Sequence, residues 1–454
     1  MREAPELEKM LGIEFYLTCQ DGIGGRIRTL LEDFVVREVL RNGLRADFSL
    51  PWPEEPLPGR GSFLLCVLTK KGVDTLAAIR GLAKSLRLPE GLVSFAGLKD
   101  ARATTAQFIT IRGVKPGELR ALRLKKASVL PVRFVLEPLG PEHLRANEFE
   151  VTIRGVELQE AEIHERLEGV LRSLTELGGM PNFFGHQRFG TARPITHLIG
   201  RELVLGHVKE AVELLLTYVG PGEGQEASEA RSYLAETWDL KGFIRLLPRS
   251  LRYEHCVANH LLRKPRDYHG AMRKLPIRLR KLFVQAFQAY LFNRFLSSRA
   301  KEGLPLSEPL DGDWVVLVDE QGLPLKAVKA RGDNLGELRR KVREGEATVA
   351  LPMPGFKQEL SGGQQRELER AVLEEEGISP SDFKVRAMPE VASPGWLRPA
   401  LARLDLLSEP EVMDDEVNPG EKAVLLSFRL PRGSYATCLL RELMKPDDII
   451  GAGF

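Results

Sequence analysis

The sequence predicts an α+β fold divided into two or three domains. A chain of 454 residues is longer than a domain with a single hydrophobic core usually is. Apolar and polar residues alternate in NEFEVTIRG (147–155), as in a half-buried strand, whereas 158–177 repeats apolar residues at helical spacing and ends in Gly178-Gly179, a helix stop. From about residue 200 to 398 helical patterns dominate, with short strands interspersed, which indicates a second α+β domain.

The N-terminal part begins with strand and helix signals in turn. EDFVVRE (32–38) places Phe34 in a strand bounded by charges, where burial in the core is the usual role of a single Phe. FLLCVLTKKG (63–72) predicts a buried strand, and the next segment has helical spacing with Asp74 as a candidate N-cap.

The stretch Phe95–Phe108 (FAGLKDARATTAQF) predicts a strand, a tight loop and a strand, with Asp100 on the loop. A carboxylate on a loop held between two strands has a rigid base and open access, and reactive groups are often found in such places. The competing interpretation is an Asp that only closes a turn, which is the commoner use of this residue.

The segment PNFFGHQRFG (181–190) combines three Phe with amide and guanidinium side chains. Aromatic faces suit stacking on a nucleobase, and the polar groups suit its edge. A Phe-anchored turn in the core explains the same residues equally well.

Charge is balanced over the whole chain but not locally. The 65 Lys and Arg against 63 Asp and Glu do not by themselves indicate a nucleic-acid partner. Between residues 263 and 281, however, eight Lys or Arg accompany one acid, Asp267. We predict that this run contacts an RNA backbone; a solvated helix and loop is the alternative. The predicted contact residues are Arg263, Lys264, Arg266, Arg273 and Lys274.

Several classes of protein lack support in the sequence. The four cysteines are far apart, so a zinc site or a disulfide framework is not expected. No apolar run approaches the length of a membrane span and no signal-peptide pattern begins the chain, so we expect a cytoplasmic protein. We find no dinucleotide or phosphate-binding glycine loop, no H-E-x-x-H and no metal-spaced His/Cys cluster.

Four motifs, taken together and in order, resemble the TruD-type tRNA pseudouridine synthases. They are EDFVVRE (32–38), FAGLKDARATTAQ (95–107), PNFFGHQRFG (181–190) and FRLPRGSYATCLLREL (428–443). Each is weak alone, but four in the same sequence order are a specific signal, and the resemblance runs from about residue 25 to 445.

The resemblance implies a pseudouridine-synthase catalytic domain, with a mixed and mainly antiparallel sheet flanked by helices, and a family-specific α+β domain inserted into it. On this chain the catalytic domain would comprise residues 1–206 and 399–454, and the insert residues 207–398. The insert coincides with the change of pattern noted above. The residue pattern of 422–445 predicts a strand, a turn and a helix, and the resemblance implies that this segment returns to complete the catalytic sheet.

The resemblance also implies the roles of particular residues. Asp100 falls on the catalytic Asp of the family. Phe34, Asn182 and Tyr435 fall on positions that contact the target nucleotide, and Phe184 is placed to stack on the base. Phe183 and Tyr435 differ from the rings that some relatives carry, but both remain aromatic.

Three further residues are candidates for supporting Asp100. Arg28 is a possible ionic partner, and Gln107 closes the Asp100 motif. Lys99 would keep Asp100 ionised if a turn brought the two side chains together. In an extended strand neighbouring side chains point oppositely, so we expect Lys99 to be exposed.

The implied reaction converts a flipped-out uridine to pseudouridine in tRNA, at position 13, without metal or cofactor. The carboxylate either attacks C1′ or removes the 2′ proton, and the sequence does not choose. The alternative is a catalytically silent tRNA-binding or folding protein on the same scaffold. A methyltransferase lacks a glycine-rich cofactor loop. No protein partner is implied, and the oligomeric state is open.

Overall fold

The computed structural model describes residues 2–54 and 56–454. Its largest element is a nine-stranded sheet with the path β13-β15-β6-β1-β4-β2-β5, to which β14 adds beside β15 and β3 beside β4. Among the strands described for this sheet, β1 and β4 pair in parallel and the other neighbouring strands are antiparallel. The prediction of a mixed, mainly antiparallel sheet is therefore confirmed. Its strands are β1 (Phe34–Leu40), β2 (Phe63–Lys71), β3 (Val93–Phe95), β4 (Thr104–Arg112), β5 (Ala127–Val135), β6 (Leu144–Val156), β13 (Asp405–Leu406), β14 (Glu411–Asp414) and β15 (Lys422–Pro431).

Two distant parts of the chain share this sheet. The long C-terminal strand β15 pairs with β6 along most of its length, from Lys422 beside Val156 to Pro431 beside Ala146. Since side chains alternate along both strands, the apolar residues of one face meet in the core. The intervening segment, residues 157–404, contributes no strand to this sheet. The boundaries of the insert at 207 and 398 stay predictions.

Helices cover the sheet where the sequence supplies an apolar stripe. On α4 (Glu160–Leu177) the buried residues are Ile163, Leu167, Val170 and Leu174, and Gly178 ends the helix with φ +88°. This helix and α14 (Ala436–Met444) share one core with β1, β6 and β15. A second core lies between α2 (Thr75–Leu86), α3 (Pro116–Arg120) and strands β2, β4 and β5.

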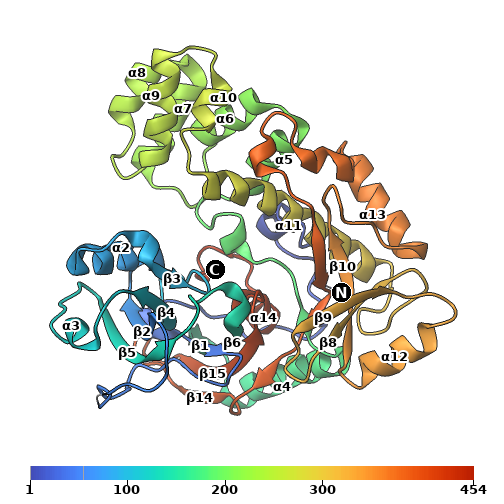
Figure 1. The fold of residues 1–454 in the computed structure, drawn as a ribbon. Coiled ribbons are helices and arrows are strands. Elements are labelled where there is room, and N and C mark those ends of the chain that lie inside the picture. Colours follow the sequence, from blue (N-terminus) through green and yellow to red (C-terminus); the bar gives the residue numbers. More distant parts are fainter. Residues whose placement is uncertain (1, 55) are drawn as a thin grey trace.

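The rest of the chain forms two further groups, which Figure 1 shows on either side of a long central helix. That helix, α11 (Ile277–Lys301), is buried on most of its circumference, as expected for an internal helix. On one side lie helices α6 to α10; on the other lies a four-stranded antiparallel sheet, β11-β10-β8-β9, with α12 against it. A two-stranded sheet pairs β7 with β12.

The remaining helices and strands have the following bounds. The strands are β7 (Met180–Pro181), β8 (Trp314–Val318), β9 (Pro324–Lys329), β10 (Ala347–Met353), β11 (Trp396–Pro399) and β12 (Leu401–Ala402). The α-helices are α1 (Glu6–Lys9), α5 (Thr196–Leu205), α6 (Val208–Thr217), α7 (Gln225–Thr237), α8 (Leu240–Leu246), α9 (Arg252–Arg263), α10 (Tyr268–Met272), α12 (Leu335–Arg343) and α13 (Gly363–Glu375). Short 3₁₀ helices span Leu31–Asp33, Glu90–Leu92, Pro141–His143, His186–Arg188, Pro380–Lys384 and Pro389–Val391.

Candidate active site

Asp100 lies on the loop between β3 and β4, and its side chain is 43% exposed. The nearest charge is the guanidinium of Arg28, whose Nη2 donates to Asp100 Oδ2 at 2.9 Å. The Arg28 side chain is only 6% exposed, and burial lowers its pKa in spite of the Asp100 charge. The pair therefore joins a buried cation to a carboxylate with a free, solvent-facing side.

Arg28 is held in place from several directions. Its backbone adopts φ +60°, a left-handed conformation that residues other than glycine seldom adopt. The guanidinium carbon lies 4.4 Å from the centre of the Phe34 ring, and Nη1 donates to the carbonyl of Gly453 at 2.9 Å. Phe34, at the start of β1, is buried. Its direct partner is thus the arginine that contacts Asp100.

Buried polar side chains hold the backbone of the Asp100 loop. Lys70, a cation within the apolar strand β2, donates from Nζ to the carbonyl oxygens of Lys99 at 3.2 Å and Asp100 at 2.8 Å. Burial lowers the pKa of Lys70 to about 8. The Thr75 hydroxyl accepts from the Lys99 amide and donates to Gln107, which in turn donates to Gly97. Gln107 therefore contacts the loop that carries Asp100, rather than Asp100 itself.

The expectation that Lys99 is exposed is wrong. Its side chain is 9% exposed, and Nζ lies 2.6 Å from Glu38 Oε1, on the middle of β1. The other Glu38 oxygen accepts from the Phe108 amide at 2.8 Å. Because residues 96–103 form a loop and not an extended strand, the alternation of neighbouring side chains does not apply to them. Lys99 pairs with Glu38, and Arg28 is the cation that meets Asp100.

The predicted aromatic residues form a cluster around Phe184. The Phe184 and Tyr435 ring centres are 5.9 Å apart, edge to face, and Phe292 of α11 makes a similar contact at 5.7 Å. The guanidinium carbons of Arg398 and Arg188 lie 3.9 and 5.8 Å from the Phe184 ring centre. Such ring–cation contacts fix the plane of the ring.

Asn182 is buried, and its amide is engaged by the protein. Its Nδ2 donates to the Pro399 carbonyl at 3.0 Å, and its Oδ1 accepts from Arg398 at 2.7 Å and from the Ser434 hydroxyl at 3.2 Å. One amide hydrogen is left for a ligand. The amide thereby ties the 181–190 segment to β11 and to the turn before α14.

These contacts bring the four predicted motifs together. Asp100 meets Phe34 through Arg28, and Tyr435 lies beside Phe184 and next in sequence to the Ser434 that bonds Asn182. Phe34, Ala103, Phe184 and Phe428, one residue from each motif, belong to the same hydrophobic core, and Tyr435 packs against that core.

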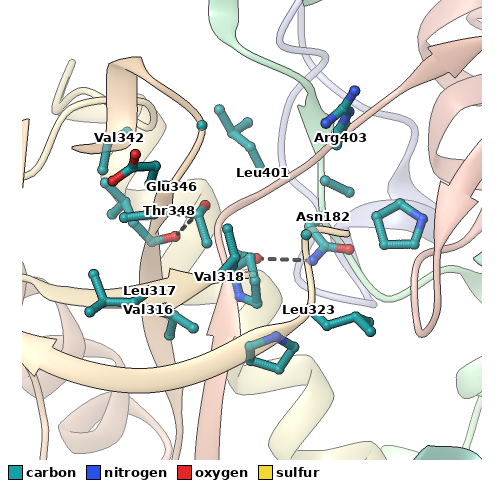
Figure 2. A pocket seen from close by; sticks show the side chains of 18 of the residues that line it. Asn182, Val316, Leu317, Val318, Leu323, Val342, Glu346, Thr348, Leu401 and Arg403 are labelled. Atoms are coloured by element: carbon teal, nitrogen blue, oxygen red, sulfur yellow. Dashed lines mark hydrogen bonds between the residues drawn. The ribbon is translucent and has the colours of Figure 1, made fainter. Parts of the chain in front are cut away.

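A cleft of ≈ 1730 Å³ lies between this cluster and the four-stranded sheet. Asn182, Arg398 and Ser434 are among the residues that line it. Figure 2 shows Asn182 together with Leu401 and Arg403 across from residues of β8 and β10. Asp100 is not among the residues that line this cleft.

Two buried cations of the site were not predicted. Arg398 lies 216 residues beyond Asn182 and outside the four motifs, so no sequence spacing connects them. A lone Arg within the strand WLRP was the only available signal. The signal for Lys70 was clearer. A Lys within a strand predicted to be buried, FLLCVLTKK, cannot simply face solvent, so it is expected to have a buried partner.

The basic run 263–281 divides into two groups. Arg273 donates to Glu390 at 2.9 Å, and buried Arg280 shares the same carboxylate. These bonds, that from Arg273 foremost, lower the pKa of Glu390 to about 2. Within the described residues, the other predicted contacts are exposed and have no carboxylate within 4.0 Å; they are Arg263, Lys264, Arg266 and Lys274.

Across residues 2–54 and 56–454, no cluster of three or more His, Cys, Asp or Glu is arranged to hold a metal ion. In the same ranges, no helix combines the length and the apolar character needed to cross a membrane.

Comparison with known proteins identifies the family. The family model of tRNA pseudouridine synthase D (TruD) matches residues 10–443. A protein of Methanococcoides burtonii, described as a probable tRNA pseudouridine synthase D, is 37% identical over 99% of each chain. One of Methanopyrus kandleri with the same description is 40% identical over 86% of this chain and 88% of its own.

A solved structure agrees with both. The crystal structure of a Methanosarcina mazei protein assigned as tRNA pseudouridine synthase D superposes with a TM-score of 0.79, at 34% identity and covering 98% of each chain. Sequence and fold thus match over nearly the same residues, and the chain belongs to the TruD family of tRNA pseudouridine synthases.

Proposed function

We propose that this protein is an isomerase that converts uridine to pseudouridine in tRNA, with Asp100 as the catalytic residue. The observation that carries the proposal is a half-exposed carboxylate held by a buried arginine, whose guanidinium lies over the ring of Phe34 in the same hydrophobic core as Phe184. Membership of the TruD family supports it.

The reaction breaks the bond between C1′ of the ribose and N1 of the base, turns the base and joins C1′ to C5. C5 loses its proton and N1 gains one, so no oxidant, phosphate or outside atom is consumed. A carboxylate with a free oxygen serves this chemistry either by attacking C1′ or by removing the 2′ proton. Arg28 occupies one oxygen of Asp100 and leaves the other free.

The base has to leave the RNA stack to reach such a carboxylate. Phe184 and Tyr435 supply rings, and the Asn182 amide retains one hydrogen, for holding an extruded uracil. We propose position 13 of tRNA as the target, on the family resemblance, and the exposed cations Arg263, Lys264, Arg266 and Lys274 as contacts with the RNA backbone.

The test is to map pseudouridine in a tRNA transcript treated with wild-type protein or with Asp100→Asn. Wild type is expected to form pseudouridine at position 13 and the variant none. If wild type binds the transcript but forms none, the protein is a silent tRNA binder. If Asp100→Asn remains active, another group performs the chemistry.

A further inference from the structure

The last nine residues of the sequence, 446–454, fold back onto the segment that carries Arg28. The Ile27 amide donates to the Ala452 carbonyl at 2.9 Å, and the next arginine donates to the Gly453 carbonyl at the same distance. Ile449, Ala452 and Phe454 are buried. We call residues 446–454 the closing segment.

The closing segment has little freedom to move at Gly453. Its φ is +89°, and a Cβ at this position would lie 2.1 Å from the Ile27 carbonyl oxygen. Phe454 is 1% exposed, and its ring centre lies 5.7 Å from that of His186 in the segment 181–190. The Gly453 carbonyl is therefore fixed from both sides.

Within the described residues, the Arg28 guanidinium has two hydrogen-bond partners. Among the described residues it donates from Nη1 to Gly453 and from Nη2 to Asp100, while its buried Nε has no partner. A planar guanidinium directs its donors in fixed directions, so the bond to Gly453 sets the direction of the one to Asp100.

We propose that the closing segment is a positioning element for the reaction. The Gly453 carbonyl holds Arg28, and Arg28 holds Asp100 in the orientation that meets the ribose. This inference rests on the proposed role of Asp100. It predicts that a residue with no access to the substrate affects turnover and leaves tRNA binding unchanged.

The test measures kcat and KM for a tRNA transcript labelled with tritium at uracil C5, since isomerisation releases that hydrogen. Gly453→Ala displaces the carbonyl, and Phe454→Ala loosens its anchor. Each variant is expected to lower kcat about ten- to hundredfold, which is the effect of losing one hydrogen bond to a charged group. KM should stay within about twofold of the wild-type value. Asp447→Ala, in the same segment but 94% exposed, is the matched control and is expected to keep wild-type kcat.

A double-mutant cycle separates positioning from general disruption. If the closing segment acts through Arg28, Gly453→Ala costs no further kcat in an Arg28→Ala background. Kinetics are measured well below the unfolding midpoint of each variant. Unchanged kcat in Gly453→Ala and Phe454→Ala, an effect confined to KM, or equal losses with and without Arg28 would each overturn the proposal. An active Asp100→Asn would instead defeat the proposed function, so the two failures are distinguishable.

Discussion

Arg28 with Asp100, and Arg441 with Glu8, are two arginine–carboxylate pairs whose N–O distances are nearly equal, at 2.9 and 2.8 Å. Their surroundings differ. Glu8 and Arg441 are both fully buried, and Arg441 also donates to Glu442, itself buried. The Asp100 carboxylate opens to solvent on one side.

The difference is visible in the two guanidinium groups. Burial acts to lower the pKa of both, but the two buried carboxylates raise the pKa of Arg441, whereas that of Arg28 remains lowered. In the buried network, Arg441 is paired with the carboxylates of Glu8 and Glu442. At Asp100 one carboxylate oxygen remains free. On the proposed function, the exposure of this acid is what distinguishes its pair from the structural pair of Glu8.

The sharpest test exchanges one acid from each pair for its amide. Asp100→Asn is expected to lower kcat by more than about 10³-fold, with a smaller effect on the unfolding midpoint than Glu8→Gln, because the half-exposed Asn side chain keeps an oxygen that accepts from Arg28. Glu8→Gln is expected to lower the midpoint while the folded molecules keep their kcat. Tritium release measures kcat and calorimetry measures the midpoint. A loss of kcat in Glu8→Gln would contradict the view that Glu8 acts on stability and Asp100 on the reaction.

Replacing the buried Arg441 should reduce stability more than breaking an exposed ion pair does. Arg441→Ala leaves Glu8 and Glu442 buried without their cation, and the expected loss is about 3–5 kcal/mol in the free energy of unfolding. The control is Arg172→Ala, which breaks an exposed pair with Glu168 and should cost less than about 1 kcal/mol. Denaturant unfolding compares them; equal losses would contradict the comparison.

The buried network also predicts a pH dependence. His186 is fully buried, 3.5 Å from Glu8, and burial lowers its pKa. Unfolded His186 therefore takes up a proton near pH 6.5, whereas folded His186 does so only at a lower pH. The stabilisation is fully present above about pH 6.5 and is lost as the pH falls through the lowered pKa. His186→Gln should reduce the slope by up to about 1.4 kcal/mol per pH unit. An unchanged slope would mean that His186 is already protonated by Glu8.

The smallest effect concerns the exposed cations. Replacing Arg263, Lys264 and Arg266 by Gln should weaken tRNA binding and reduce the slope of log K against log salt by up to about 0.7–0.9 for each RNA phosphate that the protein no longer neutralises. Arg273→Gln is the matched comparison, since Glu390 already balances that charge, and it should change the slope less. Equal slopes for wild type and the triple variant would make the run only a solvated surface.

Local patterns were enough for much of the fold. Strand alternation and helical spacing predicted β6, α4, β15 and α14, because burial of an alternating face or an i, i+4 stripe leaves its period in the residues themselves. The Asp100 loop was predicted from its flanking strands in the same way. Lys99 was misjudged because the path of a loop, unlike a strand, has no period from which to infer the direction of a side chain.

By itself the sequence determined the secondary structure around the site, the order of the four motifs and, through them, the family. Only the tertiary structure decided which charges meet. Arg28 pairs with an acid 72 residues away, Arg398 reaches Asn182 over 216 residues, and Gly453 holds Arg28 across 425. The physical reason is that a hydrogen bond depends on distance and direction in space, whereas sequence spacing constrains these only within one helix, strand or turn.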